Sequence, residues 1–531
     1  MKWSLMFLVP CTVALAQTPG VDKDALAGFE SIRADDLRSY LTVLSSDELQ
    51  GRETSYAGEK MAAEYIAAHF TSLGLKPLGD DRTYLQHYDV DLVRVSDSSV
   101  IALAGGSRPQ VFRWLKDFIG FGSRDVECGG SVACVGYSDN RIPAADRQSL
   151  AGKIVMTFIG SRTGAPLPVR RGMLRGARRD SGAVATLVVA ADTGATSYER
   201  LFALFSASGA PRGMMTLKGD SVRQARLGAP SFLVSPALAK AILETGGMSL
   251  ADLRAEASRD SVFTPRTVSG ALVSINTFAQ REQRRAENVV GLLEGSDPGR
   301  RGDVVVFSAH FDHLGVGGDG AIYHGADDDG SGTAMVMELA AAFARNPVRP
   351  KCSVVFLAVS GEEKGLLGSA YYTAHPAIPL DRTVADFNAD MIGRMDTTHE
   401  HAGSGPYTYL IGSDKISTEL DSILRVANRE SNNIALDYTY NTERDPNQFY
   451  RRSDHYNFAR KGVPIAFFFT GTHADYHRPT DTIDKILFDR MVKIGQLVYY
   501  AGWKTANCGR ALVKNGSGIE YREQPAGAPE P

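Results

Sequence analysis

The 531-residue chain predicts an α/β fold with a mostly parallel central sheet, because apolar strand-like runs alternate with helical stretches. The run at 303–309 is rich in β-branched residues, as in a parallel strand buried on both faces. A periodic stretch at 333–345 predicts a helix, and a second buried-strand run follows at 353–359. Further strand-like segments lie at 383–391 and 465–469.

Side chains that bind metals follow these strand-like runs. His310 and Asp312 come directly after the first run, and Glu362 and Glu363 come after the second. Asp390 ends the third segment. Ligand crevices in open α/β sheets lie at the carboxyl ends of the strands. We therefore expect these side chains to meet at one edge of the sheet.

An acidic loop and one histidine complete the set. Asp327, Asp328 and Asp329 stand side by side between glycines, and three adjacent carboxylates repel one another unless a cation holds them. His477 follows the last strand-like run. Two divalent ions about 3.5–4 Å apart need ligands for each ion, a bridging carboxylate and a free base beside the shared water. The clusters together meet that requirement and predict a two-metal hydrolase.

Each cluster taken alone also has an ordinary structural explanation. The three aspartates suit a solvated loop or a helix cap, and Glu362 with Glu363 suits an exposed helix start, where carboxylates favour the helix dipole. Asp390 is the exception, because an unpaired carboxylate in an apolar segment is costly. The joint occurrence of the clusters carries the prediction.

The motifs resemble those of the M28 family of co-catalytic zinc aminopeptidases over residues 285–485. They are, in order, S-A-H-F-D-H-L-G, G-A-D-D-D-G-S-G, S-G-E-E-K-G-L-L-G-S, N-A-D-M-I-G and D-Y-H-R-P-T-D-T. The stretch 44–53, continued through 74–77, is similar to the beginning of the secreted bacterial members. The resemblance implies that Asp327 bridges two zinc ions. Glu363 and His477 would complete one site, and His310 and Asp390 the other.

The same resemblance implies the roles of three further residues. Glu362 would be the general base, and Asp312 would orient the imidazole of His310 and raise its basicity. Asp328 would lie in a cis-peptide turn. Zinc suits the mixed imidazole and carboxylate ligands best, although manganese or cobalt fits such sites too.

Three functions remain open at this stage. The first is a secreted di-zinc aminopeptidase that acts on peptides with a free N-terminus. The second is a metallocarboxypeptidase or dipeptidase on the same metal core, and the third is a non-catalytic, metal-stabilised binding protein. Glu362 argues against the third, because a structural site has no use for a free carboxylate beside the water.

Some neighbouring polar residues have no firm assignment. The segment 452–458 is either a border of the active site or a polar loop that caps the last core strand. Proximity in sequence to a ligand does not make His313, His324 or His473 a ligand. Side-chain preference and oligomeric state are not predicted.

The chain divides into five parts. Residues 1–16 resemble a signal peptide with an A-x-A-like cleavage site, which predicts a secreted or periplasmic protein. Residues 17–117 and 269–510 form the predicted three-layer α/β/α peptidase domain. The β-rich insertion 118–268 resembles a protease-associated domain, and we expect it to act as a lid or to position the substrate. The tail 511–531 is predicted to be disordered.

Composition excludes two classes of partner. The net charge is −3, from 58 basic and 61 acidic residues without blocks, which gives nucleic-acid binding no electrostatic support. After the first sixteen residues, no segment approaches eighteen apolar residues, so no stable membrane insertion is predicted. The basic cluster 170–179 is expected to be a solvated face.

Four cysteines remain outside the predicted signal peptide, and an oxidising compartment allows disulfides. Cys128 and Cys134 are close enough in sequence to close a small loop, and a pairing of Cys352 with Cys508 is also open. Connectivity does not follow from sequence.

Overall fold

The structure is a computed structural model. It describes residues 20–105, 108–120, 125–163, 182–194, 196–207, 213–219 and 229–516. The predicted signal peptide, the basic cluster 170–179 and residues 517–531 of the predicted tail lie outside the described residues.

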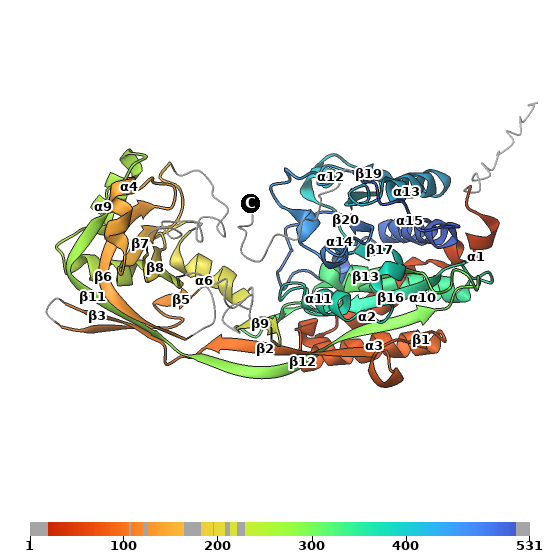
Figure 1. Cartoon of the computed structure of the whole chain (residues 1–531), viewed down its shortest axis with the longest axis horizontal. Helices are drawn as coiled ribbons and strands as arrows, with labels where there is room; N and C mark the ends of the chain where they lie inside the picture. Colours follow the sequence, from red (N-terminus) through yellow and green to blue (C-terminus); the bar gives the residue numbers. More distant parts are fainter. Residues whose placement is uncertain are drawn as a thin grey trace, which may run out of the picture.

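Two lobes make up the molecule, and a long antiparallel ribbon connects them (Figure 1). The larger lobe contains a ten-stranded sheet with the order β19-β18-β20-β17-β13-β16-β12-β2-β9, and β1 pairs with β12. Its strands are β1 (Lys76–Pro77), β2 (Leu85–Val95), β9 (Met214–Leu217), β12 (Ala279–Leu293), β13 (Val304–His310), β16 (Ser353–Val359), β17 (Thr383–Ala389), β18 (Tyr407–Ile411), β19 (Ala435–Asp437) and β20 (Ile465–Phe469).

The centre of this sheet is parallel, and its outer part is mixed. Strands β16, β13, β17 and β20 run parallel in that order, and every residue of these strands is buried. Towards the ribbon, β12 and β2 run antiparallel to their neighbours, and at the other side β18 is antiparallel to β20. The predicted parallel strands therefore form the centre of a larger mixed sheet.

Helices cover both faces of the ten-stranded sheet and make three layers. One face packs against α1 (Lys23–Ser31), α2 (Ala34–Leu44), α3 (Ala57–Ser72), α10 (Gly332–Arg345), α13 (Thr418–Glu430) and α15 (Phe488–Asn507). The opposite face packs against α11 (Leu367–Ala374) and α14 (His455–Ala459). Alternate residues of β13 point to the two layers: Val305 and Phe307 belong to the first core, and Val304 and Val306 to the second.

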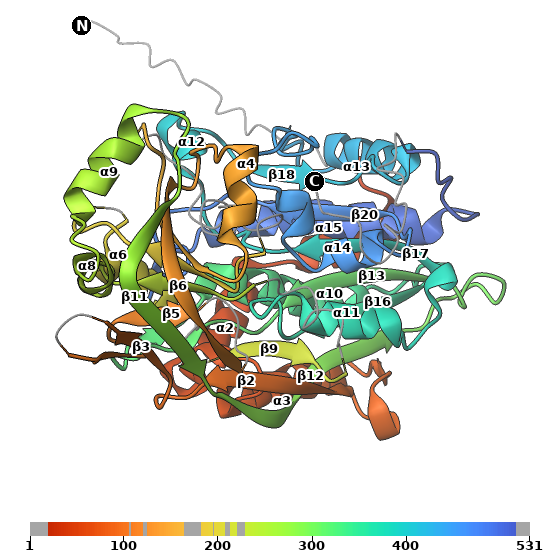
Figure 2. The same ribbon diagram turned by 60° about the vertical axis from the view of Figure 1, so that its left-hand side comes forward.

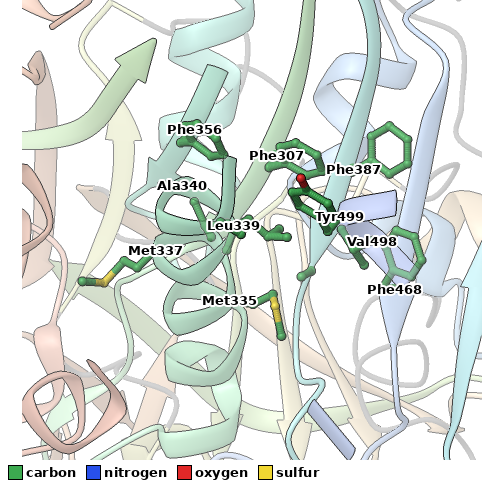
Figure 3. Packing of buried hydrophobic residues seen from close by; sticks show 14 of the residues in the cluster. Phe307, Met335, Met337, Leu339, Ala340, Phe356, Phe387, Phe468, Val498 and Tyr499 are labelled. Carbon is green, nitrogen blue, oxygen red and sulfur yellow. The ribbon is translucent and has the colours of Figure 1, made fainter. Parts of the chain in front are cut away.

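Aromatic side chains fill the first of these cores. The ring of Phe307 stacks on Phe356 with centroids 5.9 Å apart and also contacts Phe343 and Phe387, as Figure 3 shows for the labelled rings. Helix α15 can approach this cluster because it carries Gly502, where a Cβ atom would come within 2.2 Å of the Phe307 ring. This packing fixes β13, the strand that ends in His310.

The smaller lobe contains an eight-stranded sheet with the order β4-β3-β11-β6-β7-β8-β10-β5. Its strands are β3 (Val100–Ala104), β4 (Gln110–Arg113), β5 (Phe118–Gly120), β6 (Val126–Tyr137), β7 (Ile154–Phe158), β8 (Ala185–Val189), β10 (Ser231–Val234) and β11 (Arg266–Thr277). Its helices are α4 (Ala144–Arg147), α6 (Tyr198–Ala207), α8 (Pro236–Glu244) and α9 (Leu250–Arg259). Figure 2 shows β6 and β11 side by side on this lobe.

The boundary between the lobes differs from the predicted insertion at 118–268. Strands β3 and β4 precede this range, and β11 continues beyond it to Thr277. In addition, β9 lies within the predicted insertion but pairs with β2 of the larger sheet. Part of the predicted insertion therefore belongs to the larger sheet.

The cysteine pair of the smaller lobe cannot form the small disulfide loop considered above. Cys128 and Cys134 both lie on β6, opposite Ile275 and Arg266 of β11. Six residues of extended strand separate two Cα atoms by about 20 Å, well above the spacing of a disulfide. The four cysteines of the described residues are all free.

Two smaller elements lie near the ligand-bearing turns. Strands β14 (Gly315–Val316) and β15 (Ile322–Tyr323) form a hairpin between β13 and the acidic loop, and α12 (Thr397–His401) follows β17. Among the described helices, none is long and apolar enough to cross a membrane.

A buried glutamate on α10 gives the fold a pH dependence. The backbone N–H of Arg33 donates to Glu338 Oε1 at 3.0 Å, and this bond together with the Tyr40 side chain only partly offsets the cost of burying the carboxylate. Burial raises the pKa of Glu338 to about 7. An acid with a raised folded-state pKa stabilises the fold below its unfolded pKa, and this stability is lost as the pH rises through the folded value.

We therefore expect Glu338→Gln to stabilise the protein by about 1–3 kcal/mol at pH 8, and the gain should shrink as the pH falls towards 5. Thermal unfolding midpoints between pH 5 and 8 measure this effect. Glu64→Gln is the matched control, because it removes the same charge from the exposed surface of α3. Equal shifts for both variants would contradict the assignment.

Candidate metal centre

The ligand-type side chains meet at the carboxyl ends of the central strands. His310 is the last residue of β13, Glu362 and Glu363 lie in the turn after β16, and Asp390 follows β17 directly. Parallel pairing places His310 opposite Val359 of β16 and Ser308 opposite Asn388 of β17, so the three turns start from the same edge.

The first group of ligand atoms, called here the His310 group, consists of His310, Asp328 and Asp390. His310 Nε2 lies 3.5 Å from Asp328 Oδ1 and 3.6 Å from Asp390 Oδ1, and all three residues are buried. Burial alone lowers the pKa of His310, but the charges of Asp390 and Glu362 raise it well above its ordinary value. The imidazole is therefore held in a strongly negative environment.

The second group, called here the His477 group, consists of Asp328, Glu363 and His477. His477 Nε2 lies 3.1 Å from Asp328 Oδ2 and 3.2 Å from Glu363 Oε2. Burial alone would raise the pKa of the Glu363 carboxyl group. The neighbouring imidazoles of His477 and His313 outweigh this effect and lower the pKa to about 2. Asp328 belongs to both groups, with one carboxylate oxygen in each.

His313 is a buried neighbour of the His477 group that the sequence did not assign. Its Nδ1 lies 2.9 Å from Glu363 Oε1 but 3.9 Å from Asp328 Oδ2. His477 is nearly equidistant from the two carboxylates, whereas His313 is close to one. Both imidazoles thus lie beside Glu363: the ligand atom of His313 lies within 4.8 Å of those of Asp328 and Glu363, and His477 lies at nearly equal distance from the two carboxylates.

Asp327 does not occupy the place expected for a bridging carboxylate. Its Oδ1 accepts a hydrogen bond from the Gly393 N–H at 2.7 Å, and its Oδ2 lies 3.1 Å from His473 Nε2. It belongs to neither group of ligand atoms, whereas the next residue, Asp328, is shared by both. The position shared by the two groups is therefore held by Asp328 and not by Asp327, the residue for which the resemblance implies the bridging role.

The other two aspartates of the region hold the acidic loop in place. Asp329 accepts hydrogen bonds from the N–H groups of Gly332 and Met391, and the peptide bond between Asp328 and Asp329 is cis. Asp481 accepts from the N–H groups of Asp327 and Asp328. Asp328 thus points into the site from a backbone fixed on both sides.

Glu362 lies beside the His310 group without belonging to it. Its Oε2 is 4.0 Å from His310 Nε2, and burial together with Glu363 and Asp390 raises the pKa of Glu362 well above its usual range. Asp312 Oδ1 accepts the N–H of Glu362 at 3.1 Å. The nearest contact between Asp312 and His310 Nδ1, at 3.1 Å, is made by the Asp312 backbone oxygen; its carboxylate is 3.6 Å away. Asp312 thus contacts both Glu362 and His310.

The remaining candidate segment, 452–458, mostly contacts residues around the site and contributes no side chain to the two ligand groups. Ser369 Oγ donates to Asp454 Oδ1 at 2.5 Å, and burial raises the pKa of Asp454 to about 7. Arg452 is the exception, because its guanidinium donates to the hydroxyl of Tyr476, the neighbour of His477. His324 Nε2 contacts Asp47 Oδ1 and lies in neither group.

The buried polar atoms of the two groups fit a pair of divalent cations. Four of them face only other ligand-type side chains and make no hydrogen bond of good geometry among the described residues: His310 Nε2, Asp328 Oδ2, Glu363 Oε1 and Asp390 Oδ1. Buried polar groups without good partners are rare and costly, so their convergence at one place fits the binding of cations. The imidazole and carboxylate donors suit zinc better than magnesium or calcium.

The sequence is similar to a family of peptidases and to individual aminopeptidases and metalloproteases. Residues 288–502 match the model of peptidase family M28. Aminopeptidase YwaD of Bacillus subtilis is 29% identical over 220 residues, which cover 40% of this chain and 43% of the relative. A probable zinc metalloprotease of Pyricularia oryzae is 28% identical over 263 residues, 42% of this chain and 50% of that protein. The chain thus spans half or less of the length of these relatives.

Solved structures resemble the fold over most of the chain. An aminopeptidase from Aneurinibacillus sp. strain AM-1 has a TM-score of 0.57 at 19% identity and covers 92% of this chain and 97% of its own. A zinc aminopeptidase from Bacillus subtilis has a TM-score of 0.52 at 18% identity, with coverages of 89% and 95%. These similarities confirm the predicted α/β/α fold.

Proposed function

Because residues 288–502 match the model of peptidase family M28, we propose that the protein is an aminopeptidase that hydrolyses the N-terminal bond of peptides with two zinc ions. The observation that carries this proposal is the Asp328 carboxylate, which presents one oxygen to the His310 group and the other to the His477 group. A shared carboxylate flanked by two separate ligand sets is the arrangement that a two-metal hydrolase needs.

His310 and Asp390 would hold one ion, and Glu363 and His477 the other, with Asp328 between them. When bound, zinc supplies Lewis-acid chemistry that makes water more acidic and the scissile carbonyl more electrophilic. Glu362 takes a proton from the attacking water as the new C–O bond forms. It then gives this proton to the departing amine as the C–N bond breaks. The Asp312 carboxylate holds the backbone N–H of Glu362 and so keeps this base in place.

Three further expectations belong to the proposal. The substrates are peptides with a free N-terminus, and the protein acts in the periplasm or outside the cell, as the signal-like residues 1–16 suggest. The smaller lobe would be the protease-associated domain and would position the substrate. The long ribbon of β2 and β12, whose residues pair from Leu85 with Val289 to Val95 with Ala279, leads from the ten-stranded sheet towards this lobe.

Hydrolysis of matched peptides tests the function. Four versions of one peptide, with free or acetylated N-termini and free or amidated C-termini, are incubated with and without chelator and added zinc. We expect chelator-sensitive cleavage that requires the free amine. A requirement for the free carboxylate would instead establish the carboxypeptidase or dipeptidase function, and no cleavage by zinc-loaded protein would favour the binding protein.

A further inference from the structure

Arg52 is a fully buried arginine beneath the metal centre, and it lies outside the region that matches family M28. It ends the short 3-10 helix η1 (Asp47–Arg52) in a left-handed backbone conformation, with φ 49°. The preceding Gly51 has φ 66°, and a Cβ atom there would come within 2.3 Å of the Tyr323 carbonyl oxygen. The chain is therefore tightly docked on the β14–β15 hairpin at this point.

The guanidinium of Arg52 joins three separate segments. Its Nε donates to the Phe311 carbonyl oxygen at 2.6 Å, and its Nη1 donates to those of Leu44 and His324. Its Nη2 donates to the Gly325 carbonyl oxygen at 2.9 Å. Phe311 stands directly after His310, and Gly325 begins the turn that leads to Asp328. One side chain thus fixes the backbone of two ligand-bearing turns.

Neighbouring residues of the same segment reach the other side of the centre. The Arg52 carbonyl oxygen accepts the His313 N–H at 3.2 Å, and Thr54 Oγ1 donates to Asp312 Oδ2 at 2.8 Å. Glu53 forms a buried ion pair with Lys364, the residue after Glu363, at 3.0 Å. The segment 52–54 therefore contacts each of the turns that carry His310, Asp328 and Glu363.

The charge of Arg52 has a second role. Its four hydrogen bonds all go to neutral carbonyl oxygens, and no ion pair among the described residues includes it. Burial lowers the pKa of Arg52 to about 10, and the nearby carboxylates of Asp312, Asp329 and Asp481 oppose this shift, so it remains a cation at neutral pH. Burying an unpaired cation is costly, and a side chain that only packed these segments together would not need the charge.

We propose that Arg52 is a positioning residue of the metal centre. Its guanidinium holds the turns of His310 and Asp328 at the spacing that two cations require, and its charge offsets the surplus of buried carboxylates around them. This inference rests on the metal centre of the proposed function but not on the peptidase activity.

Zinc affinity tests the proposal, measured on the full chain by competition with a chromophoric chelator. We expect Arg52→Met to weaken zinc binding about 10- to 100-fold, the range found when a group that orients metal ligands is removed. Arg52→Lys keeps the charge but cannot reach all four oxygens, so its affinity should be intermediate. Thermal midpoints with and without zinc give a second measure, and the upward shift caused by zinc should be smaller in both variants.

Arg300→Met is the matched control. Arg300 is also largely buried and donates to a backbone oxygen, that of Cys508, and it pairs with Asp303 far from the metal ligands. We expect this variant to lower the thermal midpoint without changing zinc affinity. If Arg52→Met does not fold, the zinc affinities of Arg52→Lys and Arg300→Lys are compared instead. Only Arg52→Lys should bind zinc more weakly than the wild-type protein.

Two results separate this inference from the proposed function. Wild-type zinc affinity in the Arg52 variants, or an equal loss in the Arg300 control, would overturn the role of Arg52. Zinc binding by the wild-type protein without cleavage of any peptide would overturn the aminopeptidase proposal and leave the Arg52 inference intact.

Discussion

Glu362→Gln is expected to abolish peptide hydrolysis and to leave the zinc content unchanged. Glu362 belongs to neither the His310 group nor the His477 group, so its replacement removes no ligand. Gln has nearly the same shape but cannot accept the proton of the attacking water. General acid–base catalysis contributes roughly 10²- to 10⁴-fold, and kcat should fall by about that factor.

The measurements are kcat and KM for a cleaved peptide, together with zinc per chain after dialysis. Glu363→Gln, one residue further on, is the informative partner variant. Because Glu363 faces His477 at 3.2 Å, its variant should lose zinc as well as activity. Loss of zinc from Glu362→Gln would show that Glu362 is a ligand, and retained turnover would show that another group is the base.

The sequence predicted the scaffold of the site because the central strands are buried on both faces. Such strands are continuous apolar runs, so β13, β16 and β17 stand out without any knowledge of their partners. The polar residues that follow each run are then placed at the carboxyl edge of the sheet. This is why His310, Glu363 and Asp390 were expected together, and the structure brings them together.

The acidic loop shows where this reasoning ends. Asp327, Asp328 and Asp329 are chemically identical and adjacent, so the sequence cannot tell which of them faces the two ligand groups. The choice is made mainly by contacts from distant segments: Gly393 and His473 contact Asp327, and Met391, together with the nearby Gly332, donates to Asp329. Asp328 alone is left with both oxygens turned to the ligand groups.

Long-range contacts also explain the other differences. Arg52 is about 260 residues from Phe311 in the chain, and a single arginine in a polar stretch carries no signal of burial. The pairing of β9 with β2, and the placement of Cys128 and Cys134 on one strand, follow from which strands meet in space. Local patterns specify a strand, but they do not specify its neighbour.

Asp328→Asn is expected to remove zinc from the centre, whereas Asp327→Asn should retain two ions per chain. Asp328 Oδ1 lies 3.5 Å from His310 Nε2 and Asp328 Oδ2 lies 3.1 Å from His477 Nε2, so each oxygen serves one group. Asn presents one oxygen and one NH₂ donor, and an NH₂ group does not bind a cation. At least one ion should be lost. Because the attacking water is then no longer activated, the rate of hydrolysis should fall by roughly 10²- to 10⁴-fold, as expected for Glu362→Gln.

Asp327→Asn tests the neighbouring residue at the same change in charge. Its side-chain oxygen can still accept the Gly393 N–H, and its NH₂ group can face His473. We expect zinc affinity to fall at most about 10- to 100-fold, as for a residue that supports ligands without binding the ion. Zinc per chain after equilibrium dialysis, measured on both variants at the same free zinc, decides between them. The opposite outcome, with zinc lost from Asp327→Asn and retained by Asp328→Asn, would return the bridge to Asp327. The acidic loop would then have to change its conformation on ion binding, so that Asp327 takes the position that Asp328 has in the structure.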